Sequence, residues 1–222
     1  MSTAATESDY IGRLATKFRT CPATGLKVDL AAERLIKANA VAAVVFLAIG
    51  GLFGLSVALT RWPAVHLLPA DWFYLALTAH GLDVLLLWIL FFEVAVLYFA
   101  SAILLNSRLA APRWAWAAFG LMLTGGLITN VAVLQGESTV MFTSYPPMKA
   151  APHFYLGMIL FAVGALVGFG VGTIGTLLSS PCTSQKSSGE CGLYILMAGG
   201  TTAGIGALVG AIVGLGRQGP RT

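Results

Sequence analysis

The stretch VAAVVFLAIGGLFGLSVAL, residues 41–59, decides the fold class of this protein. It carries no charge, and it lies inside a longer apolar run from Leu35 to Thr60. A helix needs about 20 mostly apolar residues to cross the hydrocarbon core of a bilayer. Because backbone polar groups in lipid must be satisfied within the protein, such a run is expected to cross a membrane as a helix.

Four further runs in the 222-residue chain have the same character. They cover residues 72–105, 114–134, 153–178 and 193–215. The first of these four is longer than a bilayer requires, which predicts a tilted helix or one that extends beyond the lipid. We therefore expect an all-α integral membrane bundle of about five transmembrane helices.

The overall composition leads to the same fold class. Hydrophobic residues make up 57% of the chain and charged residues only 10%, whereas soluble domains have roughly 25% charged residues. A soluble protein of this size could not hide so much apolar surface, because most of a small domain still faces water. The lipid bilayer is therefore the expected surrounding. The formal net charge of +4 is too modest to predict nucleic-acid binding.

The distribution of basic residues predicts the orientation and the domain organisation. Lys and Arg are concentrated in the amino-terminal part of the chain, at Arg13, Lys17, Arg19, Lys27, Arg34 and Lys37. Because positive charge collects on the cytoplasmic side, the amino terminus is expected inside and, after five spans, the carboxy terminus outside. The expected organisation is a cytoplasmic segment 1–33, a five-helix transmembrane domain 34–216 and a short tail 217–222.

His80 is the first candidate functional residue, because ionisable side chains inside a membrane are costly and usually serve a function. It lies in the outer part of the second run, within the sequence LTAHG. A neutral imidazole is a good ligand for haem iron, and the adjacent Gly81 would let a flat macrocycle approach the helix backbone. The alternative is a histidine that is simply hydrogen-bonded within the helix packing.

Two carboxylates follow in the same run, and Asn130 is a further polar residue, near the outer end of the third run. Asp83 comes three residues after His80, on a similar helix face. There it could accept a hydrogen bond from the imidazole or from a haem substituent, or point to the lipid headgroups. Glu93 is expected roughly 20 Å further inward and about 140° round the helix. A buried carboxylate there suits proton uptake, and the alternative is an ion pair or hydrogen bond to a neighbouring helix.

Glycine is concentrated in the last two runs. Gly164, Gly168 and Gly172 follow one another at intervals of four residues, a spacing that lets helix backbones approach closely. This pattern indicates either packing within the bundle or a docking face for another subunit.

Several stretches resemble the amino-terminal part of subunit I of the haem-copper terminal oxidases, most closely the B-type cytochrome c oxidases. They lie in family order between Cys21 and Gly170: TGLKVDLAAERLIKANAVAAVVF, LTRWPAVHLL, DWFYLALTAHGLD, FFEVAVLYFASAILLNSRL and VMFTSYPPMKAAPHFYLG. The LTxHG element followed by FTxYPPxK and FYLG is the most specific part of this resemblance. The run at 193–215 matches the family poorly.

The resemblance implies that His80 ligates the iron of a low-spin haem. Gly81 and Asp83, from their positions near His80 in the sequence, are the other expected cofactor-binding residues. In this family the second axial ligand, the copper histidines and the ligand of the high-spin haem come from later helices, which have no counterpart here. The chain has three histidines in total. It is therefore not expected to be a complete oxidase alone, and copper and the high-spin haem would lie on a partner chain.

Two classes of function follow from these observations. The first is a split or shortened subunit I of a cytochrome c oxidase, an oxidoreductase only as part of its complex. A partner chain would supply the remaining helices and the second haem ligand, a subunit II-like protein would deliver electrons, and Glu93 would belong to a proton path. The second is a non-catalytic haem-binding or scaffold subunit of another respiratory or oxidative complex. Either protein would be a multi-pass protein of a bacterial or archaeal plasma membrane.

Overall fold

The computed structural model describes residues 18–22, 25, 27–104, 109, 111–138 and 149–179 of the chain. Within these residues, four helical segments are long and apolar enough to cross a membrane. They are Leu30–Arg61, Ala70–Ile103, Pro112–Leu134 and Pro152–Thr173. These segments confirm the first four predicted runs and the prediction of a membrane helix bundle. The fifth predicted run, at 193–215, lies outside the described residues.

Three of the four spans are single α-helices, and the second is built from four pieces. The single helices are α2 (Leu30–Arg61), α5 (Pro112–Leu134) and α6 (Pro152–Ser179). The second span consists of α3 (Ala70–Leu82), the π-helical segment η1 (Asp83–Leu87), α4 (Trp88–Phe99) and the π-helical segment η2 (Ala100–Leu104).

The π-helical segment η1 changes which residues share a face of the second span. The backbone N–H of Trp88 donates to the carbonyl of Asp83, five residues earlier. A π turn inserts one residue into a helix and rotates everything after it, and such turns are frequent at functional sites. The predicted angle of about 140° between His80 and Glu93 assumed an uninterrupted α-helix, so it does not describe this span.

The chain divides into two compact units. Unit 1 comprises Met1–Ile36, Val96–Ala115 and Leu166–Thr222, and unit 2 comprises Lys37–Ala95 and Trp116–Ala165.

Unit 1 contains a short antiparallel hairpin that the sequence did not predict. Its strands are β1 (Phe18–Thr20) and β2 (Lys27–Asp29), with Phe18 opposite Asp29 and Thr20 opposite Lys27. The turn includes Gly25, whose φ of +69° is in the left-handed region that glycine adopts without strain.

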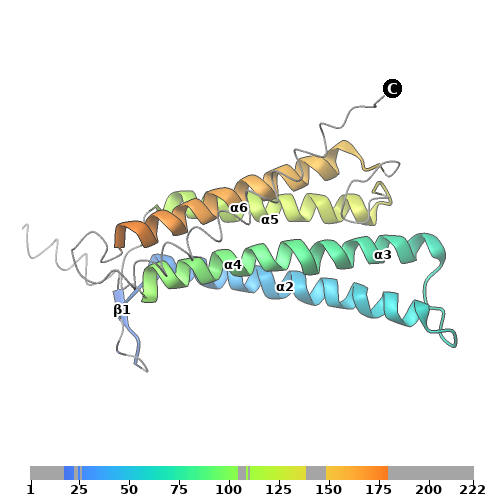
Figure 1. Ribbon diagram of the computed structural model, residues 1–222, viewed down its shortest axis with the longest axis horizontal. Helices are drawn as coiled ribbons and strands as arrows, with labels where there is room; N and C mark the ends of the chain where they lie inside the picture. The colour runs from blue at the N-terminus through green and yellow to red at the C-terminus, as the bar shows by residue number, and fades with distance from the viewer. Residues whose placement is uncertain are drawn as a thin grey trace, which may run out of the picture. The chain divides into compact units, whose positions relative to one another are not determined.

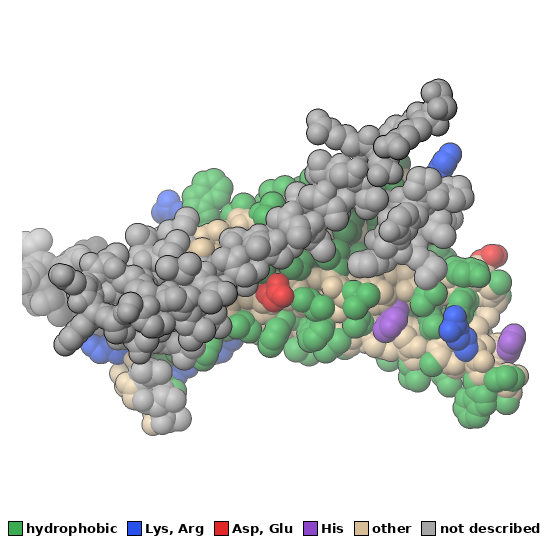
Figure 2. All heavy atoms as spheres, in the orientation of Figure 1, with side chains coloured by type: hydrophobic (Ala, Val, Ile, Leu, Met, Phe, Trp, Pro, Cys, Tyr) green, Lys and Arg blue, Asp and Glu red, His purple; other side chains and the backbone are tan. Residues whose placement is uncertain are grey.

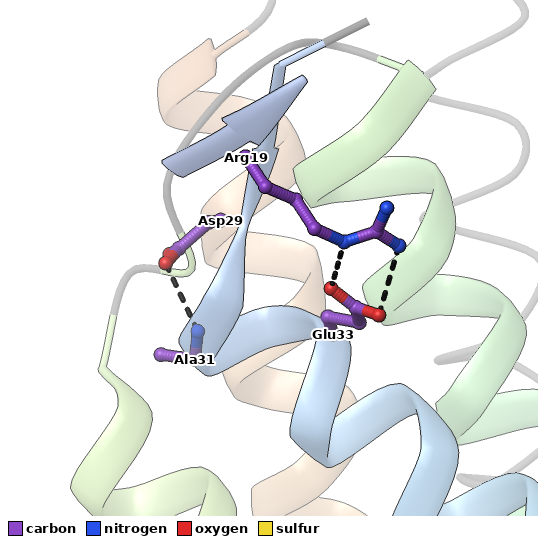
Figure 3. Close-up of polar contacts among 4 residues, drawn as sticks. All are labelled: Arg19, Asp29, Ala31 and Glu33. Atoms are coloured by element: carbon purple, nitrogen blue, oxygen red, sulfur yellow. Dashed lines mark hydrogen bonds and ion pairs between the residues drawn. The ribbon is translucent and has the colours of Figure 1, made fainter. Parts of the chain in front are cut away.

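The hairpin of unit 1 is joined to the first turn of α2 by polar contacts (Figure 3). Arg19 donates through Nε and Nη2 to the two carboxylate oxygens of Glu33, at 2.8 and 2.9 Å. This hydrogen-bonded pair raises the pKa of the Arg19 guanidinium above its ordinary value. Asp29 accepts a hydrogen bond from the backbone N–H of Ala31 at 3.1 Å, and so satisfies one of the free N–H groups at the start of the helix.

In unit 2 the side chain of Phe91 joins four helices. It is fully buried, and its ring stacks on Phe46 of α2 with a centroid separation of 5.6 Å. It meets Phe119 of α5 and Phe161 of α6 edge-on, at 6.0 and 5.6 Å. Edge-to-face and offset-stacked rings at these separations are favourable arrangements. One aromatic side chain of α4 therefore forms the centre of this unit.

Small residues bring the helices of unit 2 close together, with α5 beside α6 and α2 beside α3 (Figure 1). A Cβ atom added at Gly125 would lie 2.6 Å from the carbonyl oxygen of Gly157, and one at Gly164 would lie 2.7 Å from the backbone nitrogen of Met122. Lipid gives helices no hydrophobic reason to associate, so such close packing is a main source of stability.

Two glycines of the series in α6, Gly164 and Gly172, lie where another helix packs closely. Gly164 packs on α5 in unit 2, and in unit 1 a Cβ at Gly172 would lie 2.6 Å from Leu97. Of the two interpretations of the series, these contacts support packing within the bundle.

The outward faces of the helices carry large apolar side chains (Figure 2). Examples with more than half of their surface exposed are Val41, Leu52, Tyr74, Leu85, Trp114 and Ile159. In water such a surface would aggregate, but it is the surface expected of helices that face lipid tails or other membrane helices.

Replacing Phe91 by Ala tests its central position. We expect the change to lower the free energy of unfolding by about 3–5 kcal/mol, the usual cost of deleting a buried phenyl ring. Phe92→Ala is the matched control, because Phe92 is 49% exposed. Thermal unfolding of both variants in detergent is the measurement. Equal losses would mean that Phe91 has no special role in the packing.

Candidate functional site

His80 is held in a defined orientation by the backbone of the neighbouring helix. It lies in α3 and is partly buried, and its Nδ1 is 2.8 Å from the carbonyl oxygen of Gly50 in α2. Because a carbonyl oxygen only accepts hydrogen bonds, this contact assigns the ring hydrogen to Nδ1. The lone pair of Nε2 is then available, which is the arrangement of most histidines that bind a metal.

Two glycines of α2 make this orientation possible. A Cβ atom at Gly54 would lie 2.7 Å from both Cε1 and Nδ1 of His80, inside the space of the ring. A Cβ atom at Gly50 would lie 2.8 Å from Cβ of Asp83. The helix that carries the histidine thus packs directly on a glycine face. Gly50 and Gly54 show the same spacing of four residues as the glycine series of the fourth predicted run, and this spacing is their signal in the sequence.

Asp83 is completely buried, and it binds Asn130 of α5. Its Oδ1 accepts a hydrogen bond from Asn130 Nδ2 at 2.8 Å, and the same amide donates to the carbonyl of Gly126 at 3.1 Å. The other carboxyl oxygen, Oδ2, is buried and has no hydrogen-bond partner among the described residues.

The structure excludes two of the three partners considered for Asp83. Exposure to lipid headgroups is wrong, because none of its surface is accessible. The imidazole of His80 donates to Gly50 and not to Asp83. The reason is tertiary: α5 presents an amide to the carboxyl group, and α2 presents a carbonyl to the imidazole. The interaction of Asp83 with a cofactor stays a prediction.

Gly81 faces open space. A Cβ atom at this position would have no atom within 4 Å. The backbone next to His80 is therefore accessible on that side, as the approach of a flat macrocycle requires. The assignment of Gly81 to a cofactor site stays a prediction.

Glu93 lies in α4, where its side chain is exposed. The prediction of a buried carboxylate is therefore wrong. Its neighbours in sequence and one turn away, Phe92 and Val96, are exposed apolar residues. A helix that is apolar on all sides gives no sequence signal for its inward face, and the π turn of η1 rotates α4 relative to α3. The role of Glu93 in a proton path stays a prediction.

No cluster of three or more His, Cys, Asp or Glu residues that could hold a metal ion occurs in the part of the chain that the structure describes.

Four helices that are long and apolar enough to cross a membrane define a class, the integral membrane helix bundles. The sequence comparison is more specific: the family model for cytochrome c and quinol oxidase polypeptide I matches residues 34–216. The chain belongs to this family, which confirms the resemblance found in the sequence.

Two relatives illustrate the extent of the match. Cytochrome c oxidase subunit 1 of Thermus thermophilus is 31% identical over 130 residues, which are 54% of this chain and 23% of the relative. A haem-copper terminal oxidase dimer solved by cryo-electron microscopy has a TM-score of 0.63 and 25% identity, over 72% of this chain and 28% of that chain. The chain thus spans about a quarter of the length of each.

Gly54→Ala tests the contact between α2 and the imidazole. The added methyl group occupies the space of the His80 ring, so the bond to Gly50 should be lost and stability should fall by about 1–3 kcal/mol. Gly51→Ala is the matched control, because a Cβ there meets nothing within 4 Å. The measurement is thermal unfolding in detergent, and a Gly54→Ala variant as stable as Gly51→Ala would contradict this description of the site.

Proposed function

We propose that this chain provides the low-spin haem site of a membrane-bound haem-copper oxidase, in which His80 would hold the haem iron. The observation that carries the proposal is the bond from Nδ1 of His80 to the carbonyl of Gly50, which leaves Nε2 free to bind. Membership of the oxidase family supports the same assignment.

The residues around His80 fit a haem group. The imidazole is only partly buried, so a ligand can reach it, and Gly81 has open space where a side chain would otherwise stand. A haem bound here would supply one-electron redox chemistry, because its iron alternates between the ferric and ferrous states.

The chain itself performs three tasks at this site. The carbonyl of Gly50 fixes the tautomer and the ring plane of His80, as outer-shell partners of metal-binding histidines usually do. Gly54 provides the space in which the ring lies. The apolar helices around the site limit the access of water, which influences the potential of a redox group.

The rest of the catalytic apparatus belongs, in this proposal, to other helices. The two remaining histidines are placed differently from His80: His66 lies exposed in the turn after α2, and His153 at the start of α6 is 3.4 Å from Glu137. A partner chain would supply the remaining oxidase helices, the second haem ligand, the high-spin haem and copper. A subunit II-like protein would deliver electrons.

Glu93 keeps a place in this proposal as a member of a proton path. Because its side chain is exposed, the path would run along the surface of α4 and be covered by the partner's helices. The assembled protein would work in the plasma membrane of a bacterial or archaeal cell.

His80→Ala tests the proposal on the complex purified from membranes. We expect the low-spin haem spectrum and the corresponding haem content, measured as the pyridine haemochrome, to be lost because the iron loses an axial ligand. Oxygen consumption should fall to background. His66→Ala, an exposed histidine of the same chain, should retain both. A His80→Ala complex with a normal low-spin spectrum would exclude the assignment.

A further inference from the structure

Asp83 and His80 both pack on Gly50 of α2, since a Cβ atom at Gly50 would lie 2.8 Å from Cβ of Asp83 and its carbonyl receives the imidazole. Asp83 follows His80 by three residues, a spacing that places two side chains on a similar helix face. Yet the Nδ1–H of His80 donates to the carbonyl of Gly50 at 2.8 Å, and the carboxyl group accepts from Asn130 at 2.8 Å. The imidazole and the carboxyl group therefore each have a different partner, although they pack on the same residue of α2.

The choice of acceptor matters for a histidine that binds iron. A carboxylate draws the Nδ1 hydrogen more strongly than a neutral carbonyl does, and so makes the imidazole a more basic ligand. A more basic ligand donates more electron density and favours the ferric state. The acceptor at Nδ1 therefore helps to set the midpoint potential of the haem.

Asn130 is held in a position from which it donates a hydrogen bond to the Asp83 carboxyl group. Its amide is fixed by a second hydrogen bond to the carbonyl of Gly126, one turn earlier in α5. Asp83 is fully buried, and its Oδ2 lacks a hydrogen-bond partner among the described residues. The bond from Asn130 to Oδ1 is therefore the one side-chain hydrogen bond described for this carboxyl group. Without Asn130, both oxygens would need a donor, and a buried carboxyl group without one is strongly unfavourable.

We propose that Asn130 is a positioning residue that keeps the Asp83 carboxyl group away from His80. Asn130 thereby leaves Nδ1–H to the neutral carbonyl of Gly50 and prevents the imidazole from becoming a strongly basic ligand. This inference rests on the proposed function, in which His80 binds the low-spin haem. It adds a residue of α5 that acts on the haem potential without touching the haem ligand.

The test is a double-mutant cycle on the purified complex, read as the midpoint potential and the electron paramagnetic resonance signature of the low-spin haem. Asn130→Leu should favour the ferric state about tenfold, which is about 59 mV for one electron. In the Asp83→Asn background the same change should cause no such shift, because the freed side chain is then a neutral amide. Asn130→Ser, too short to reach the carboxyl group, is the second variant if Asn130→Leu does not assemble.

The control is Thr124→Val, also in α5, because the hydroxyl of Thr124 donates within its own helix, to the carbonyl of Gly120 at 2.6 Å. It should leave the potential unchanged. The inference is overturned if the potential is unchanged in both Asn130 variants. It is also overturned if the Asn130 variants shift the potential equally in the Asp83 and the Asp83→Asn backgrounds, because a merely structural role acts in both. If His80→Ala has removed the low-spin haem, such a result defeats this inference alone. If His80→Ala retains that haem, the proposed function itself fails.

Discussion

The contact between α2 and α3 at Gly50 and Gly54 is the interaction on which the candidate site depends. Two missing side chains let one helix lie directly on the other, and the carbonyl of Gly50 then receives the imidazole hydrogen of His80. In lipid this bond does not compete with water, so the orientation that it imposes on the ring is well defined. Asp83 packs on the same surface of α2 and accepts a hydrogen bond from Asn130. The segment that carries His80 and Asp83 is thus bound to α5 as well.

The packing that supports this contact uses few kinds of interaction. Phe91 fills the centre of unit 2 with stacked and edge-on rings, and glycines such as Gly125 and Gly164 bring α5 and α6 together. Aromatic contacts and close packing at glycine both suit a membrane. Apolar side chains there gain nothing by leaving lipid, so differences in stability between helix arrangements come from how well they pack. Among the polar side chains between these helices, His80, Asp83 and Asn130 are held in specific hydrogen bonds.

The sequence predicted most accurately the positions of residues that stand out in a local pattern. His80 stood out because an ionisable side chain in an apolar run is costly, and the LTxHG element carried the family resemblance. Glu93 was misplaced because the residues around it are apolar, so the sequence does not show which face turns inward. The π turn at Asp83–Leu87 compounded this error, because neither apolar periodicity nor the family motifs predict it.

The sequence by itself determined that the chain crosses a membrane, where its first four helices lie, and to which family it belongs. These properties follow from the length of apolar runs and from motifs, which are local. Tertiary structure alone decided that His80 donates to Gly50, that Asp83 binds Asn130, and that Glu93 is exposed. Each of these depends on which faces of separate helices meet, and residues 30 and 47 positions apart in the chain reveal such a pairing only once the helices are packed.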